Sequence, residues 1–244
     1  MEDLFQEIDQ LKDKIDSYRP FEGELLKQLR NYYKIGLTYT SNALEGNSLT
    51  ETETKILLED GLTVGGKPIR DYYEATGHGR AYNYIYSLTT GEEIKEEQIK
   101  TIHRLFYSLI DDSQAGRYRN QRVLISGSNY VPPDPMTVPV LMAEFVNWVK
   151  ESEGKFHPVK YAALAHKNFV FIHPFVDGNG RVARLIMNLC LLRSGYTIAI
   201  IPPILRGEYI SLLEKAHRDD RDFVRFIAER VKETQKDYLR LLGA

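Results

Sequence analysis

The residues best suited to chemistry lie in one segment of fourteen, "FIHPFVDGNGRVAR" (171–184), which holds a histidine, an aspartate, two glycines and two arginines between apolar stretches. If the segment joins two helices, "DGNG" lies at the N-terminus of the second, where backbone N–H groups lack partners and glycines let a bulky anion approach. Arg181 and Arg184 are three residues apart on that helix and can face the same region. The segment therefore predicts a polyphosphate site.

Two further side chains fit a reaction on that polyphosphate. Asp177 would repel phosphate unless a divalent cation lay between them, and one carboxylate with phosphate oxygens is a common way to hold Mg²⁺. His173, with an ordinary pKa near ~6.5, is mostly neutral at pH 7 and can accept a proton. A neutral histidine beside a metal-bound triphosphate suggests a base for a hydroxyl that attacks phosphorus.

Simpler interpretations compete with this one. A lone histidine or arginine pair is usually structural. "GNGRVA" also fits a dinucleotide-binding fingerprint, but residues 179–206 contain no acid for the ribose and the chain lacks a strand–helix alternation. A P-loop motif is absent as well. His157, His166 and His173 lack the spacing of a zinc site, because Pro174 ends the helix that would align them. These alternatives are less favoured.

The composition limits the classes of protein. The 244-residue chain is 43% hydrophobic and 27% charged with a net charge of −2, so nothing electrostatic favours nucleic acid. Its charged N-terminus is no signal peptide, and no stretch reaches the ~20 apolar residues of a membrane span. The single cysteine, Cys190, excludes a disulfide framework and is predicted to be buried. We expect a cytoplasmic protein that binds neither nucleic acid nor membrane.

The apolar residues recur with helical spacing almost throughout. The clearest boundary signals are the capping box "TETE" at 50–53, Pro158 at the start of a helix and Pro174 at its end. The helices are expected at about 4–15, 22–39, 50–61, 71–88, 95–110, 138–152, 158–174, 182–195, 206–218 and 222–242.

Residues 122–131 depart from this pattern. The β-forming run "VLI", the turn residues "GSN" and the following "PP" predict a short β-hairpin. We found no internal repeat and no low-complexity segment. The predicted fold is all-α with one small β-hairpin.

The loop sequence "HPFVDGNGRVAR" (173–184) resembles the H-P-F-x-[D/E]-G-N-[G/K]-R-x-x-R signature of the Fic (Fic/Doc) family at every defined position. The similarity extends from about Lys95 to Arg230 and includes "AGRYRN", "EFVNWV" and "HPVKYAALAH". It implies an all-α, Fic-type helical core with a β-hairpin flap at 122–131. Residues 95–244 would be the catalytic core, and residues 1–94 an N-terminal helical region.

The resemblance implies a reaction. His173 would be the general base for a Ser, Thr or Tyr hydroxyl of a protein target. Asp177 would hold Mg²⁺, or Mn²⁺, against the α- and β-phosphates of ATP, and Phe175 would anchor the loop in the core. Attack at the α-phosphorus would then transfer AMP and release pyrophosphate, which is a protein adenylylation.

The resemblance also implies the nucleotide contacts. Gly178, Asn179 and Gly180 would form the anion hole, with Asn179 orienting the α-phosphate. Arg181 would grip the β-phosphate and Arg184 the γ-phosphate. Gly180, where relatives that transfer phosphate carry Lys, goes with the use of ATP.

The resemblance also implies roles for residues around the loop, although no sharp motif marks them. Tyr209, Leu213 and His217 share a helical face and would border the adenine. The flap would hold an extended segment of the target by strand addition. The flap residues in question are Leu124, Ile125, Ser126, Asn129 and Tyr130.

A second motif lies upstream. "SNALEGN" (41–47) resembles the family's inhibitory motif [S/T]-x-x-x-E-[G/N], represented by Ser41, Glu45 and Gly46. Its place before the core is typical of the branch with an N-terminal inhibitory helix. Glu45 would pair with Arg184 and so remove the partner of the γ-phosphate, leaving bound ATP misaligned. A capping or turn role for "EGN" is the alternative.

The sequence thus predicts a self-inhibited protein adenylyltransferase that uses Mg²⁺ and ATP and modifies a protein target, itself included. Two other functions stay open: removal of AMP by the same site, and a catalytically silent module that senses nucleotide or binds protein. The aromatic stretch "NYYKIGLTYT" (31–40) predicts packing on the core, with a homodimer contact as the alternative.

Overall fold

The computed structural model describes residues 1–91, 93–125, 128 and 130–244, and the regular structure of these residues is entirely helical. The all-α part of the predicted fold is therefore confirmed. None of the helices in the described ranges combines the length and apolarity that a bilayer span requires. The helices are α1 (Glu2–Asp16), α2 (Gly23–Ala43), α3 (Glu51–Asp60), α4 (Ile69–Ser87), α5 (Glu96–Tyr107), η1 (Pro135–Thr137), α6 (Val138–Ser152), α7 (Pro158–Ile172), α8 (Asn179–Arg193), η2 (Pro203–Leu205), α9 (Arg206–Lys215) and α10 (Arg221–Leu242).

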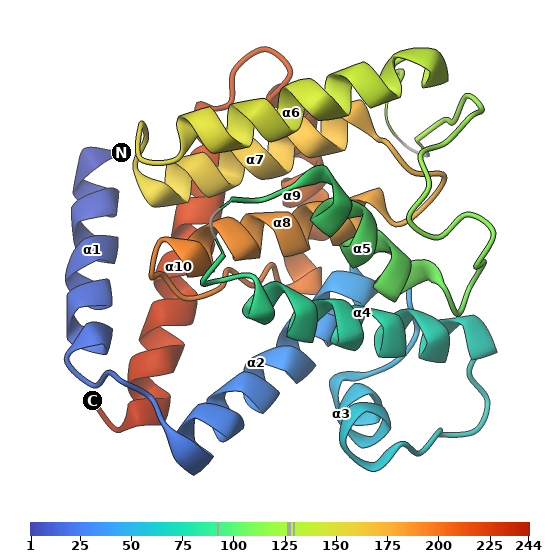
Figure 1. The fold of residues 1–244 in the computed structure, drawn as a ribbon. Coiled ribbons are helices and arrows are strands. Elements are labelled where there is room, and N and C mark those ends of the chain that lie inside the picture. The colour runs from blue at the N-terminus through green and yellow to red at the C-terminus, as the bar shows by residue number, and fades with distance from the viewer. Residues whose placement is uncertain (92, 126–127, 129) are drawn as a thin grey trace.

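The antiparallel pair α7–α8 forms the centre of the molecule (Figure 1). Helix α8 is buried around most of its circumference, as expected for a helix with apolar residues on every face. Cys190 lies on it without exposure to solvent, so the prediction of a buried thiol is confirmed. Helices α4, α5, α6 and α10 pack around this pair and hold the α7–α8 loop in place.

The helix boundaries follow the signals in the sequence. Thr50 accepts a hydrogen bond from the Glu53 N–H (3.2 Å), and the Glu53 side chain accepts one from the Thr50 N–H (2.7 Å), which completes the predicted capping box. Pro158 is the first residue of α7, also as predicted. Helix α2 extends four residues beyond its predicted end, to Ala43. Burial of its polar last turn outweighs the weak helix propensity of "TYTSNA".

The first forty residues pack on the rest of the chain. Helix α1 lies along α10 (Figure 1), and the Gln235 side chain donates a hydrogen bond to the Ile8 carbonyl at 3.1 Å. Tyr33 in α2 is 1% exposed and stacks on Tyr238, with ring centroids 4.5 Å apart. The core-packing interpretation of "NYYKIGLTYT" is therefore confirmed for this residue, whereas the homodimer stays a prediction.

The predicted β-hairpin at 122–131 is not found. The described residues of this segment form no strand, and Ser126 and Asn129 lie outside the described residues. A two-stranded ribbon is marginal in water without a further strand or a covered face, and Leu124 is 88% exposed. Side chains hold the segment instead: Tyr130 donates to the Phe171 carbonyl at 2.7 Å, and Ser128 donates to the Glu214 carboxylate.

The contact between α4 and α5 supplies a test of the fold. A Cβ atom on Gly77 would lie 2.1 Å from the carbonyl oxygen of Phe106, which belongs to the backbone and cannot move aside. We expect Gly77→Ala to lower the free energy of unfolding by roughly 1–3 kcal/mol or more. Gly207→Ala in α9 is the control, because nothing lies within 4 Å of its Cβ position. It should leave stability unchanged or raise it by up to about 1 kcal/mol. Urea denaturation of both variants would decide, and a Gly77→Ala protein as stable as wild type would contradict the close approach of α4 and α5.

Candidate active site

The loop between α7 and α8 turns within six residues because two of them adopt left-handed backbone angles. His173 ends α7 at φ 51° and ψ 58°, a conformation that few residues other than glycine adopt. Gly178 precedes α8 at φ 79°, and a Cβ there would lie 2.7 Å from the Phe106 ring. Position 178 therefore requires glycine for both its backbone angle and its packing. Strain of this kind at His173 is common where the position of a side chain matters for function.

The floor of the loop is fixed by hydrogen bonds to its backbone. Phe175 is fully buried, as predicted, and stacks on His103 with ring centroids 3.7 Å apart. The Gly116 N–H donates to Nδ1 of His103 at 2.8 Å, so Nε2 carries the ring proton and donates it to the Asp177 carbonyl, 3.1 Å from nitrogen to oxygen. The Asn179 side chain exchanges two hydrogen bonds with the Phe175 backbone, both 2.9 Å. Asn179 can therefore offer a phosphate its backbone N–H.

The Arg184 side chain extends from α8 to the end of α2. There it meets Glu45, which lies 139 positions earlier in the sequence. Its Nη2 lies 2.7 Å from Oε1 of Glu45 and also donates to the Ser41 carbonyl at 2.8 Å. Its Nε donates to the Ser41 hydroxyl at 2.9 Å. Burial alone would raise the pKa of Glu45, but the guanidiniums of Arg184 and Arg181 outweigh burial and lower it. Glu45 is thus held as a carboxylate against Arg184.

The Glu45 carboxylate also lies over the N-terminus of α8. A Cβ on Gly180 would come within 2.4 Å of Glu45 Oε1, so this glycine lets the carboxylate approach the backbone closely. The N-terminus of a helix attracts anions through its free N–H groups and its dipole. Gly46 follows at φ 92° and turns the chain away from α2, so the turn role considered for "EGN" accompanies the contact with Arg184.

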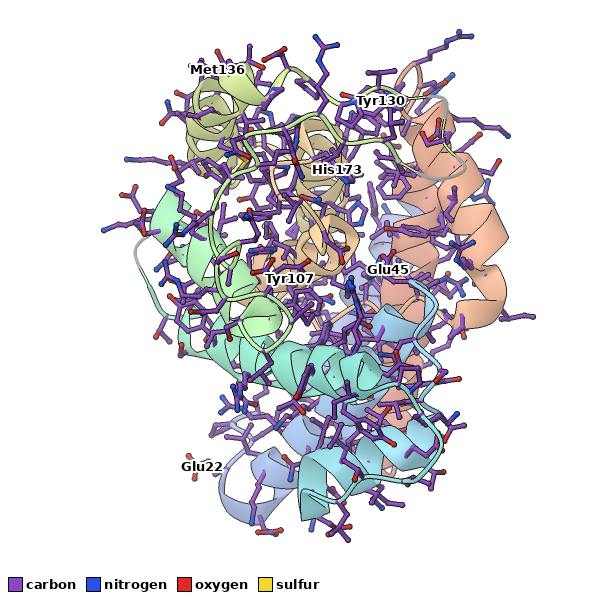
Figure 2. The ribbon with its side chains drawn as sticks, turned by 90° about the vertical axis from the view of Figure 1, so that its right-hand side faces the viewer. Glu22, Glu45, Tyr107, Tyr130, Met136 and His173 are labelled. Carbon is purple, nitrogen blue, oxygen red and sulfur yellow. The ribbon has the colours of Figure 1, made fainter. Side chains whose placement is uncertain are left out.

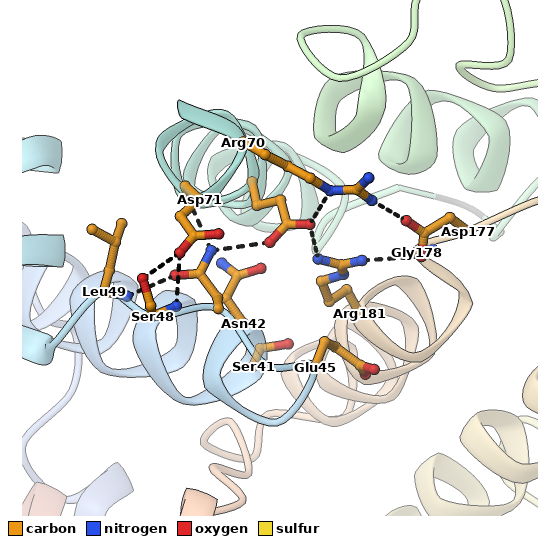
Figure 3. Close-up of polar contacts among 12 residues, drawn as sticks. Ser41, Asn42, Glu45, Ser48, Leu49, Arg70, Asp71, Asp177, Gly178 and Arg181 are labelled. Atoms are coloured by element: carbon orange, nitrogen blue, oxygen red, sulfur yellow. Dashed lines mark hydrogen bonds and ion pairs between the residues drawn. The ribbon is translucent and has the colours of Figure 1, made fainter. Parts of the chain in front are cut away.

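Arg181 and Arg184 do not share their partners, although both leave the first turns of α8. Arg181 is 3% exposed and packs over the Phe106 ring at 4.4 Å. Its guanidinium lies 2.9 Å from Glu74 of α4 and 3.2 Å from Asp177 (Figure 3). Its Nη1 is the atom that faces Glu74, and within the described part of the chain its buried Nε has no hydrogen-bond partner. Two carboxylates thus occupy most of the Arg181 guanidinium, and Nε is the donor left without a partner.

His173 lines a small cavity of about 160 Å³ together with Glu45 and Gly180. Figure 2 labels His173 and Glu45. Tyr209, Leu213 and His217 line it as well, so the residues predicted to border an adenine share one cavity with the predicted base. Ile125 and Tyr130 of the 122–131 segment complete one wall. His217 stacks on Phe171 with ring centroids 3.6 Å apart, which gives the cavity a flat aromatic edge.

Burial lowers the pKa of His173 to about 4, because the charged imidazolium would lose its hydration. The ring is therefore neutral at pH 7. Among the described residues its buried Nδ1 has no hydrogen-bond partner. A neutral imidazole beside a cavity with an anion site at its edge can accept a proton from a hydroxyl that enters there.

Three residues that the sequence analysis did not single out support the site. Arg119 is 2% exposed and donates to the carbonyls of His173 (2.7 Å), Gln121 (3.2 Å) and Pro133 (2.6 Å), so it joins the loop to the 122–131 segment. Arg206 donates to the Leu44 carbonyl at 2.7 Å beside Glu45, and Glu74 pairs with Arg181. Arg119 lies in "AGRYRN", which contributed to the family resemblance without a role for this residue. No local motif marks Arg206 or Glu74, because their partners are distant in the sequence.

The donor set at Asp177 fits a divalent cation only together with a substrate. The described residues include no cluster of three or more His, Cys, Asp or Glu that could hold a metal ion. The Asp177 carboxylate is 37% exposed and supplies hard oxygen donors. Mg²⁺ is commonly held by one carboxylate, water and phosphate oxygens, so the phosphates of a substrate would have to complete the set that Asp177 begins.

Comparisons with known proteins agree with this geometry. A model of the Fic/DOC family matches residues 93–191. The protein adenylyltransferase Fic of Drosophila yakuba is 38% identical over 237 residues, which is 96% of this chain and 47% of that protein. The structure of Fic-1 (aa134–508) from C. elegans superposes with a TM-score of 0.89 at 31% identity, covering 99% of this chain and 72% of that one. A Fic domain containing signaling protein from Bacteroides thetaiotaomicron gives 0.88 at 29% identity, covering 96% and 97%. The chain spans about half the length of the curated relatives it matches.

The buried histidines predict how stability depends on pH. Burial lowers the pKa of His78 and His166 to about 3 and that of His103 and His173 to about 4. In the unfolded chain each would titrate near ~6.5. The unfolded state therefore binds more protons below that pH, and the free energy of unfolding should fall as pH drops from about 6.5 to about 4. Each histidine contributes up to about 1.4 kcal/mol per pH unit.

Denaturation curves at pH 7 and pH 5, with NMR titration of the histidine rings, would check this dependence. Four rings should keep the shifts of neutral imidazole down to pH 5. A ring among the four that titrates near ~6.5 in the folded protein would contradict its burial as a neutral group.

Proposed function

The chain belongs to the Fic/DOC family, and from that premise we propose that it is a protein adenylyltransferase, which transfers AMP from ATP to a hydroxyl side chain of a protein. The observation that carries the proposal is the neutral, buried His173 beside a cavity that borders the N-terminus of α8. The relatives named as adenylyltransferases support it. Because the chain spans less than half of their length, the activity of the whole protein is part of the proposal.

The triphosphate would lie along the first turn of α8. The backbone N–H groups of Asn179 and Gly180 would donate to it, because a helix leaves its first N–H groups unpaired. The Gly178 N–H donates to Asp177 Oδ1 at 2.6 Å and would join them only by leaving that carboxylate. Arg181, whose buried Nε has no partner among the described residues, would hold the β-phosphate. Arg184 would hold the γ-phosphate once Glu45 leaves. The cavity wall at Tyr209, Leu213 and His217 would receive the adenine.

His173 would take the proton from a Ser, Thr or Tyr hydroxyl of the target. The hydroxyl oxygen then bonds to the α-phosphorus, the bond from that phosphorus to the oxygen bridging the β-phosphate breaks, and pyrophosphate leaves with the electron pair. Bound at Asp177, Mg²⁺ or Mn²⁺ would neutralise phosphate charge. The strained backbone of His173 and the three hydrogen bonds of Arg119 keep the imidazole in place for this proton transfer.

The target would bind along the 122–131 segment. Its described residues form no strand with the rest of this chain, so an extended segment of another protein could pair with it. The N–H groups of Ser128 and Tyr130 already donate within the segment, to the Ile125 carbonyl and the Ser128 hydroxyl, so the pairing would use the other backbone groups. Leu124, 88% exposed, and Ile125 and Tyr130, which line the cavity, would face that segment. Ser126 and Asn129 keep their predicted role as a proposal from the sequence.

Self-inhibition is part of the proposal. Glu45 uses the Arg184 donors and covers the N-terminus of α8, both of which the γ-phosphate end of ATP would need. Residues 1–94 would then act as the regulatory region and residues 95–244 as the catalytic core. A cytoplasmic location belongs to the same proposal.

Removal of AMP from a modified protein is the second candidate. Glu45 lines the cavity together with His173, so its carboxylate could orient a water molecule toward a bound AMP ester. The two directions are separated by supplying either ATP with an acceptor protein or an adenylylated protein alone.

The role of His173 can be tested by substitution. His173→Ala, made in the Glu45→Gly background, should leave ATP binding nearly intact, because the loop backbone and the arginines hold the phosphates. Transfer of label from α-labelled ATP in cell lysate with Mg²⁺ should fall roughly 10²–10⁴-fold. His157→Ala is the matched control. His157 lies at the N-terminal end of α7, against Asp9 and opposite the end that carries His173, so its replacement should leave transfer unchanged. Transfer near the parent level in His173→Ala would refute the proposed base.

The metal requirement is tested by replacing Mg²⁺ with EDTA in the same assay. Transfer should then be lost, and it should return when Mg²⁺ or Mn²⁺ is added.

The inhibitory pair gives a second test. Glu45→Gly frees Arg184 without altering the proposed base, so it should raise AMP transfer, self-modification included. Adding Arg184→Ala should abolish that gain, while Glu45→Asp should remain partly inhibited, because the charge survives on a shorter side chain. Equal labelling by wild type and Glu45→Gly on every acceptor would rule out inhibition through this contact.

A further inference from the structure

Four charged residues beside the loop form a closed ring of alternating sign (Figure 3). Arg70 lies 3.1 Å from Glu74 and 2.5 Å from Asp177. Arg181 lies 2.9 Å from Glu74 and 3.2 Å from Asp177. Each acid therefore contacts both arginines, and the ring as a whole is neutral.

The members of the ring differ in how readily they can move. Arg181 and Glu74 are 4% and 8% exposed, and the packing of α8 against α4 and the Phe106 ring holds them. Arg70 is 53% exposed and leaves the first turn of α4. Its departure would leave Glu74 and Asp177 still paired with Arg181. Arg70 is thus the one cation of the ring that can leave without unpairing a buried charge.

Arg70 is paired with the Asp177 carboxylate, which the proposed reaction needs in order to bind its divalent cation. Asp177 Oδ1 accepts from the Gly178 N–H at 2.6 Å and faces Arg181, and Oδ2 accepts from Arg70. A divalent cation on the outer side of this carboxylate would meet the positive guanidinium of Arg70. The two cations therefore exclude each other at Asp177.

We propose that Arg70 is a surrogate for the divalent cation: it neutralises Asp177 until a cation arrives, and it swings into solvent when the cation binds. The inference rests on the proposed function, in which Asp177 holds the cation of a nucleotide. Two effects of opposite sign follow. Arg70 supports binding of nucleotide without metal, because it screens Asp177 from the phosphates. It opposes binding of the metal, which must displace it.

The opposite signs distinguish this role from a structural one. A residue that merely braced α4 against the loop would, when removed, weaken both kinds of binding together. Removing a surrogate cation weakens one and strengthens the other. The scale is that of one half-exposed ion pair, so each affinity should change roughly two- to fivefold.

The experiment uses the whole chain and an ATP analogue with a methylene bridge between the α- and β-phosphates, which cannot transfer AMP. Its dissociation constant is measured by calorimetry in EDTA, and Mn²⁺ binding to the analogue complex is measured by electron paramagnetic resonance. Arg70→Gln removes the charge and keeps much of the stem, whereas Arg70→Lys keeps the charge. Arg80→Gln, at an exposed arginine of the same helix, is the matched control.

We expect Arg70→Gln to bind the metal-free analogue two- to fivefold more weakly and to bind Mn²⁺ two- to fivefold more tightly than wild type. Both affinities of Arg70→Lys should lie between those of Arg70→Gln and wild type. Both affinities of Arg80→Gln should equal those of wild type. Unchanged values for Arg70→Gln, or losses in both affinities, would overturn the surrogate role while leaving the proposed function intact. If neither wild type nor Arg70→Gln binds the analogue under any condition, the proposed function itself fails.

Discussion

The buried charge of Arg184 is the constraint on which the contact between α8 and the end of α2 depends. A guanidinium that is 2% exposed must be paired, because an isolated charge in a protein interior costs several kcal/mol. The end of α2 meets this requirement with the Ser41 hydroxyl and carbonyl and the Glu45 carboxylate. The position of α2 is therefore coupled to the state of the site: whatever replaces Glu45 must also be an anion, and a terminal phosphate is the anion that the proposed reaction brings.

Around this pair, rigid and adjustable parts of the site are separated. The α7–α8 loop is held by hydrogen bonds that involve its own backbone: Asn179 with Phe175, His103 with the Asp177 carbonyl, and Arg119 with the His173 carbonyl. Such bonds fix the free N–H groups of α8 and the imidazole before any ligand binds, which is how a preorganised site avoids a cost of reorganisation. The adjustable parts are the partly exposed side chains of Glu45 and Arg70.

The charges follow the same division. The interior of the site contains the neutral His173 and the arginines of α8, and each arginine is balanced by a carboxylate from outside α8. Glu45, in the turn after α2, and Glu74 of α4 both lie where phosphates or a bound cation would change the local balance of charge. An incoming nucleotide with its metal would exchange one set of ion pairs for another of similar charge, so the site can be neutral in both states.

The sequence by itself determined the local features of this protein. Helical periodicity, the Thr50 capping box and Pro158 predicted where the helices begin and end, because these properties depend on neighbouring residues. The anion site at the start of α8 stays a prediction from the glycines of the loop. The loop signature and "SNALEGN" also indicated the family, to which the chain belongs, and the contact between Glu45 and Arg184. Only the tertiary structure decided what depends on distant partners: the longer α2, the lack of strands in the described residues of 122–131, the three carbonyls bound by Arg119, and the ring that places Arg70 on Asp177. Some of these contacts join residues more than a hundred positions apart, such as Arg70 and Asp177, and only packing of the helices brings such residues together.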